Sequence, residues 1–192
     1  MGNRWKSDRS LGGIPKPEQP GDDSGRGAKP YLAKTTVGWL KMNVDVVVVT
    51  GKGTGYGAVV RDEMWNFLYA AVRRERAQWS PDLAEIRAIQ FGFRLKEMHD
   101  LRQIVVETDC QTIFLSLKNK GRTRTDAGLL IEEIEMEANR TGSIKWSFAR
   151  RECNQTTHLL AHTQCSWDAE EFWAGRPPVF LLSILEHDTI IN

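Results

Sequence analysis

The sequence predicts an α/β fold with a mixed five-stranded sheet and helices on both faces, in the order β-β-β-α-β-α-α-β-α. Three observations predict it. Side chains alternate over residues 39–49, and two more strand patterns follow after short turns, which indicates an antiparallel meander. A helical apolar stripe comes next. The apolar run 103–108 is then short enough to be a strand buried on both faces, as in parallel sheets covered by helices.

The first half of the chain supplies the meander and one helix. The first predicted strand covers 39–49, with an apolar face formed by every second residue from Leu40 and with Lys41, Asn43 and Asp45 on the other face. A glycine-rich turn leads to a second strand at 56–61, and another short turn leads to a third at 67–74. Ser80-Pro81-Asp82 then predicts a helix start, because it combines a capping residue, proline at the first helical position and an acid in the first turn.

The second half alternates helices with strands. After the strand at 103–108, the remaining predicted elements are helices at 110–118 and 126–140, a strand at 144–148, and a last helix from the cap Asn154 to about residue 165. Outside these elements, Asp62, Glu107 and Asp126 are interpreted as turn, edge and cap residues.

Composition sets the domain organisation. A length of 192 residues suits one domain with tails, and 41% hydrophobic residues supply a core. Residues 1–36 are rich in Gly, Pro and charge, so we expect a disordered leader there. The domain is expected over 37–166, and a tail over 167–192 is expected to pack on or near it.

The overall charge and the cysteines exclude several classes of protein. A net charge of +1 means that nucleic-acid binding must come from local patches. Three scattered cysteines without a CxxC pair favour reduced thiols over a disulfide framework or a zinc site. With no signal-peptide core and no membrane span, we expect a soluble intracellular protein, in the nucleus or the cytoplasm.

Three acidic residues stand at unusual places. Asp45 lies inside an apolar strand, where a charge needs a partner, a metal or solvent. Asp109 follows the end of the buried strand, and the carboxyl ends of parallel strands are where open α/β sheets bind ligands. Glu85 lies one turn into the first helix. Three carboxylates that converge from separate elements are what a two-metal phosphoryl-transfer site requires.

The order of the elements and several motifs together resemble type-one ribonuclease H. The resemblance spans roughly Trp39 to Cys165 and is closest to plant ribonuclease-H-like domains related to non-LTR retrotransposons. The motifs are Asn43-Val44-Asp45, Gly53-Thr54-Gly55-Tyr56-Gly57-Ala58-Val59-Val60, Leu83-Ala84-Glu85, Val106-Glu107-Thr108-Asp109 and Arg151-Glu152-Cys153-Asn154-Gln155-Thr156-Thr157-His158.

The resemblance implies an activity and its residues. By position, the catalytic and metal-binding residues would be Asp45, Glu85, Asp109 and His158, holding Mg²⁺, with Mn²⁺ as the alternative ion. The implied reaction is endonucleolytic cleavage of the RNA strand of an RNA·DNA hybrid. We expect the protein to be a monomer, to bind nucleic acid and not to bind a membrane. The residues expected to contact the nucleic acid are Gly53, Gly55, Asn154 and Arg151.

Two departures from the family pattern leave other functions open. The residue after Asp45 is usually Gly but is Val46 here, and His158 replaces an acid, which gives Mg²⁺ a poorer ligand. One alternative is therefore a catalytically degenerate domain that binds nucleic acid without cutting it. Another is a protein-interaction module that only keeps the fold. A zinc site at His158 and His162 is disfavoured, because no Glu of a zinc-protease motif lies between them.

Overall fold

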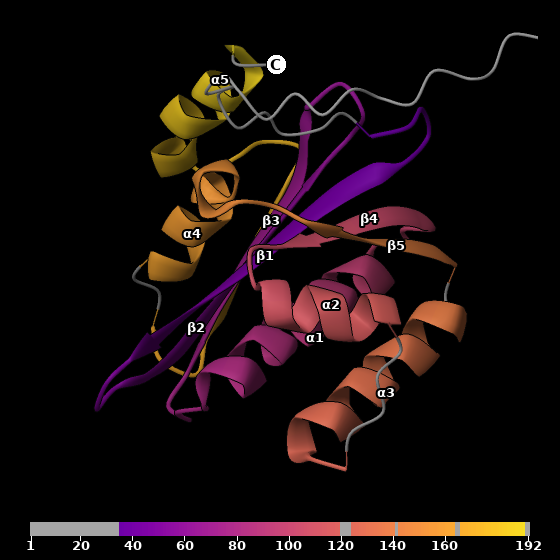
Figure 1. The fold of residues 1–192 in the computed structure, drawn as a ribbon. Coiled ribbons are helices and arrows are strands. Elements are labelled where there is room, and N and C mark those ends of the chain that lie inside the picture. The colour runs from indigo at the N-terminus through magenta and orange to yellow at the C-terminus, as the bar shows by residue number, and fades with distance from the viewer. Residues whose placement is uncertain (1–34, 120–123, 141, 164–165, 191–192) are drawn as a thin grey trace, which may run out of the picture.

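The structure is a computed structural model that describes residues 35–119, 124–140, 142–163 and 166–190, the last four without side-chain detail. It confirms the predicted α/β fold with helices on both faces of a sheet (Figure 1). The predicted leader lies outside the described residues except for its last two positions. The elements are β1 Leu40–Val49, β2 Gly53–Arg61, β3 Phe67–Glu75, α1 Pro81–Met98, β4 Gln103–Thr108, α2 Gln111–Asn119, α3 Asp126–Arg140, β5 Ser143–Phe148, α4 Gln155–His162, β6 Glu170–Ala174 and α5 Leu182–Ile190.

The sheet has six strands in the order β5-β4-β1-β2-β3-β6, so the prediction of five strands was wrong. β1, β2 and β3 form the antiparallel meander, while β4 and β5 run parallel to β1. The missed strand, β6, pairs with the outer edge of β3. Its residues are mostly exposed, so the sequence carries no clear alternation there. β6 forms because it can pair with the free edge of β3, which lies far from it in the sequence.

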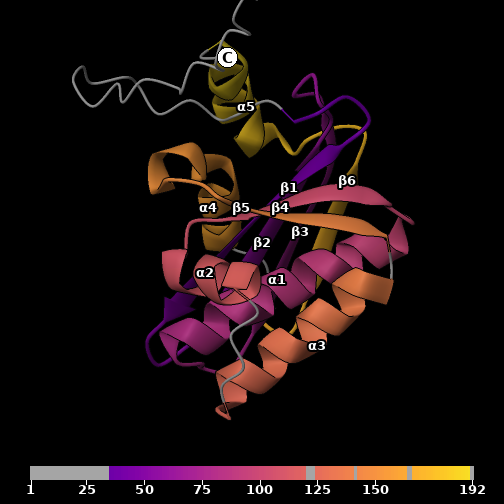
Figure 2. The same ribbon diagram turned by 45° about the vertical axis from the view of Figure 1, so that its right-hand side comes forward.

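Helices cover the two faces of the sheet as separate layers. α1, α2 and α3 lie on one side, and α4 and α5 lie on the other (Figures 1 and 2). α1 packs against β1 so closely that a Cβ on Gly92 would stand 2.8 Å from the side chains of Met42 and Val44. α4 packs against β2, where a Cβ on Gly57 would stand 2.7 Å from the Thr157 carbonyl oxygen. Glycine at these two positions therefore lets both helices approach the sheet.

Part of the predicted tail contributes to a second, smaller hydrophobic core beneath α4. Leu181 is fully buried there with Leu160 of α4 and with Val59, Ala70 and Val72 of β2 and β3. The stretch from β6 to α5 therefore completes a layer of the fold. In the described part of the chain, no helix combines the length and apolar character needed to cross a membrane.

We expect Leu181→Ala to lower the free energy of unfolding by roughly 2–5 kcal/mol, because it deletes buried methyl groups and leaves a cavity. Urea denaturation of the purified variant measures this. Leu182→Ala is the control, because Leu182 is 43% exposed, and it should cost less than about 1 kcal/mol. Equal losses in the two variants would show that the second core does not depend on this segment.

Candidate active site

Three carboxylates from separate elements meet at one point of the sheet. Asp45 comes from β1, Glu85 from α1, and Asp109 directly follows β4; one oxygen of each lies within 4.8 Å of the others. The strand register explains the meeting of the two aspartates. β1 and β4 run parallel with Asn43 beside Glu107, and Asp45 and Asp109 each lie two residues further along. The structure therefore brings together the three acids that the sequence singled out.

Asp45 is buried, and both its carboxylate oxygens are engaged. Its Oδ1 accepts a hydrogen bond from the backbone N–H of Val46 at 2.8 Å, and its Oδ2 lies 2.8 Å from Nδ1 of His158. The fourth predicted residue therefore also reaches the cluster. Val46, the departure from the family pattern, packs against the hydrophobic core with its side chain on the opposite face of β1. The Val46 side chain therefore points away from the Asp45 carboxylate.

The electrostatics of the cluster favour a bound cation. Burial raises the pKa of Asp45, Glu85 and Asp109, and Asp109 raises the pKa of Asp45 further. Glu85 is shifted most: burial, then Asp109 and Asp45, raise its pKa to about 8. The nearby Arg151 acts in the opposite direction on Glu85 and Asp109. One arginine does not offset three carboxylates, and strongly shifted acids are typical of functional sites.

The donor set fits a hard divalent cation. All three side chains offer carboxylate oxygens, the ligands that Mg²⁺ and Ca²⁺ prefer. Glu85 Oε2 is buried and, among the described residues, accepts no hydrogen bond. A buried acceptor without a partner is costly, and a metal ion would satisfy it.

α4 is held close to β1 and β2, which places His158 beside Asp45. Asn154, which precedes α4, is buried and donates a hydrogen bond from Nδ2 to the carbonyl oxygen of Val44 at 3.0 Å. Its side chain makes no capping hydrogen bond, so the predicted capping role was wrong. The polar side chain ties the helix to the strand instead. Gly57 allows the close approach, a role that the sequence motif alone did not reveal.

The predicted nucleic-acid contacts fall in two groups. Gly53 and Gly55 are buried within β2, where Cβ atoms would collide with backbone oxygens of Glu75 and Ala161. The space beside both glycines is filled by the protein itself, so internal packing accounts for them. Arg151 is exposed next to the carboxylates. Nucleic-acid contact by these residues and by Asn154 stays a prediction.

Glu107 was interpreted as an edge residue, and that was wrong. β4 lies between β1 and β5, so the side chain is buried at the centre of the sheet. It accepts hydrogen bonds from Lys41 at 3.3 Å, Asn43 at 2.8 Å and Ser147 at 3.1 Å. Like Asp45, Asn43 points to the α4 face of β1. This network is a polar neighbour of the site in which the buried charges of Lys41 and Glu107 are paired.

His162 lies beside His158 and, among the described residues, forms no hydrogen bond with the carboxylate cluster. The two imidazole rings are 4.4 Å apart, and both line a cavity of about 520 Å³ between α4 and Ile184 of α5. Burial, and then His158, lower the pKa of His162. The described residues contain no group of three or more ligands that includes His162.

Comparison with known proteins agrees with this architecture. The fold resembles the N-terminal ribonuclease H domain of a Mycobacterium tuberculosis protein, with 19% identity, a TM-score of 0.56 and coverage of 65% of this chain and 91% of that one. Ribonuclease H1 of Halobacterium salinarum has 14% identity, a TM-score of 0.53 and coverage of 64% and 94%. LC11 ribonuclease H1, determined in complex with an RNA/DNA hybrid, has 18% identity, a TM-score of 0.52 and coverage of 63% and 92%.

The fold is therefore that of ribonuclease H. The profile of the reverse-transcriptase-like family matches residues 43–164, most of the sheet and all the residues of the candidate site. The chain belongs to this family. No curated protein sequence gives a significant match, and the closer likeness to plant domains stays a prediction.

Proposed function

We propose that this protein is an endoribonuclease that cleaves the RNA strand of an RNA·DNA hybrid by two-metal-ion hydrolysis. The convergence of Asp45, Glu85 and Asp109 within 4.8 Å carries the proposal. The fold, shared with a ribonuclease H1 determined on a hybrid, supports the choice of substrate. A net charge of only +1 means that contact with the substrate must come from local positive charge.

The metal ions and the side chains would have different roles in the reaction. Mg²⁺ or Mn²⁺ bound here would supply Lewis acids that activate water and stabilise charge on the leaving oxygen. Hydrolysis would join the water oxygen to phosphorus and break the P–O3′ bond, with one proton of the water passing to the 3′ oxygen, so that a 5′-phosphate and a 3′-hydroxyl remain. Asp45, Glu85 and Asp109 would hold the ions, and the Val46 N–H and His158 orient Asp45. Arg151, near Glu85 and Asp109, provides positive charge for a phosphate.

Cleavage of an end-labelled RNA·DNA hybrid tests the proposal. The native chain should cut the RNA strand internally with Mg²⁺ or Mn²⁺ and should not cut with EDTA. A DNA duplex and a free RNA strand serve as substrate controls. If neither ion supports cutting of the hybrid, the endoribonuclease proposal fails.

We expect His158→Asp to lower the Mg²⁺ concentration for half-maximal cleavage by roughly three- to tenfold, because a carboxylate is a harder ligand than imidazole. His162→Asp is the matched control: it lines the same cavity but lacks the contact with Asp45. Metal titrations of the two variants and the native chain make the measurement. An equal shift in both variants would mean that added negative charge, rather than ligation at position 158, is responsible.

A degenerate domain that binds without cutting is the second candidate. One observation favours it: an imidazole occupies the position next to Asp45 where the family pattern has an acid. It predicts hybrid binding that weakens with salt and no cleavage with either metal. The cleavage samples, measured for binding, separate the two candidates.

A further inference from the structure

A polar cavity lies between the sheet and α1, apart from the carboxylate cluster. It has a volume of about 170 Å³, and three arginines line it: Arg73 from β3, and Arg87 and Arg94 from α1. One water molecule needs only roughly 10–15 Å³, so the space admits a small polyatomic ion. The lining is therefore cationic and comes from two separate elements.

Among the described residues, Arg87 is the arginine of this cavity that forms no ion pair. Arg73 pairs with Glu75 at 3.5 Å, and Arg94 pairs with Glu170 at 3.1 Å. The guanidinium of Arg87 stacks on the indole ring of Trp79 at 4.1 Å, and its Nε is buried without a hydrogen-bond partner among the described residues. Stacking fixes the plane of the guanidinium but uses none of its N–H donors.

The one carboxylate that lines the cavity, Glu75, is already engaged. Its Oε1 accepts hydrogen bonds from the Tyr56 hydroxyl at 2.5 Å and from Trp79 Nε1 at 2.6 Å. Burial, followed by the contact with Glu75, raises the pKa of Tyr56, so the hydroxyl stays a donor. Glu75 is therefore occupied by Tyr56 and Trp79, and among the described residues Arg87 forms no ion pair.

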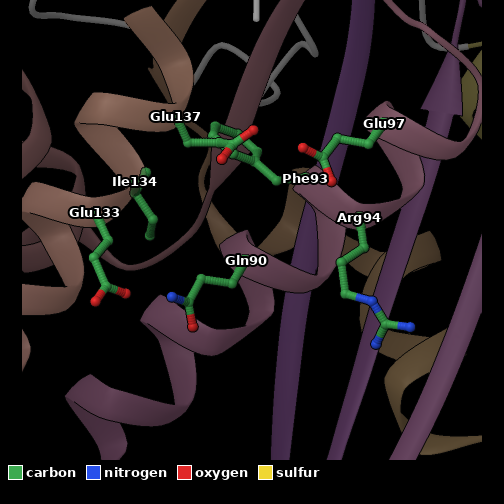
Figure 3. Close-up of a pocket in the computed structure, with 7 residues that line it drawn as sticks. All are labelled: Gln90, Phe93, Arg94, Glu97, Glu133, Ile134 and Glu137. Carbon is green, nitrogen blue, oxygen red and sulfur yellow. The ribbon is translucent and has the colours of Figure 1, made fainter. Parts of the chain in front are cut away.

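The neighbouring cavity on α1 has the opposite character. It lies between α1 and α3, has a volume of about 200 Å³, and its polar lining is dominated by Glu97, Glu133 and Glu137. Figure 3 shows Arg94 extending away from the two α3 carboxylates. The catalytic cluster is also separate, because Glu85 and Arg87 are two positions apart and point to different sides of the helix. Gln90 and Arg94 line both cavities, whereas Arg73 and Arg87 line only the cavity beside β3, which therefore carries the larger positive charge.

We propose that this arginine-lined cavity is a binding site for a phosphate group. Guanidinium forks bind phosphate and carboxylate through paired N–H donors. The N–H donors come from β3 and from two turns of α1, and Gln90 lies between the two arginines of α1 in sequence. Donors from several directions suit the tetrahedral oxygens of phosphate better than a planar carboxylate. The bound phosphate group belongs either to free phosphate or a phosphomonoester, or to a phosphodiester within a nucleic acid strand.

The Trp79 indole N–H reports on the cavity, because it donates a hydrogen bond to the lining residue Glu75 and its ring stacks on Arg87. In a nitrogen–proton correlation spectrum of the full chain in EDTA, Trp79→Phe identifies its signal among those of the seven tryptophans. Inorganic phosphate at constant ionic strength should move this signal in a saturable way. Arg87→Gln should weaken phosphate binding by roughly ten- to a hundredfold. Arg76→Gln is the control, because Arg76 is exposed, paired with Asp168 and outside the cavity.

Two further arms complete the test. An oligonucleotide with 5′-hydroxyl ends contains phosphodiesters but no phosphomonoester. A shift of the Trp79 signal with this oligonucleotide shows binding of strand phosphates. A shift with inorganic phosphate shows binding of free phosphate. Arg73→Gln must weaken binding too, and unchanged signals from the other indoles show that each variant is folded. No response to either ligand, or equal responses in Arg87→Gln and the native chain, overturns the proposal. Binding in EDTA does not depend on cleavage, so this result stands apart from the endoribonuclease test.

Discussion

Asp45→Asn is expected to reduce metal-dependent cleavage of the hybrid by at least about a thousandfold, since loss of a central metal ligand removes several kcal/mol of transition-state stabilisation. An oxygen of Asp45 lies within 4.8 Å of oxygens of the other two carboxylates, and its Oδ2 contacts His158. Asparagine keeps an oxygen to accept the Val46 N–H but brings no charge. The rate of RNA-strand cleavage at saturating Mg²⁺ is the measurement.

The fold of this variant should persist, because the substitution removes a buried charge rather than a packed group. The control is Asp100→Asn: Asp100 has a positive φ of 47°, which asparagine tolerates, and it pairs with the exposed Arg102. That variant should cleave at the native rate. Native-like cleavage by Asp45→Asn, with unchanged metal dependence, would show that this carboxylate is not a ligand.

The metal-free protein is expected to lose stability as the pH rises, and Glu85 should account for much of the loss. Its folded-state pKa is raised to about 8 from the ordinary 4.5. A raised pKa means that the folded state binds the proton more tightly. This contribution is therefore complete below pH 4.5 and is lost as the pH rises through about 8. The expected size is roughly 2–4 kcal/mol.

Thermal unfolding in EDTA between acidic and mildly alkaline pH measures this effect. Glu85→Gln should flatten the decline, because glutamine does not ionise. Glu171→Gln, at an exposed position on β6, should follow the native curve. Saturating Mg²⁺ should restore the stability of the native chain at high pH, because a bound cation favours the charged carboxylates. A native curve that stays level across this range would contradict the assigned electrostatics.

Local patterns in the sequence determined most of the elements and the acids of the site. The two-residue alternation of β1 and the capped stripe of α1 depend on neighbouring residues, so they can be recognised without tertiary information. Asp45, Glu85 and Asp109 stood out because a charge in or beside an apolar element needs a partner, a metal or solvent. The motif order then indicated the ribonuclease H fold, which the structure and the family match confirm.

Only the tertiary structure decided the features that depend on contacts between distant residues. β6 becomes a strand because β3 offers it an edge, and Glu107 is buried because β5 covers the other side of β4. Gly57 is needed because α4 packs onto its backbone. None of these follows from local periodicity, since strand order and helix packing set burial and hydrogen-bond partners. The same is true of the cavity in which Arg87 of α1 and Arg73 of β3 lie together, with Arg87 Nε unpartnered among the described residues.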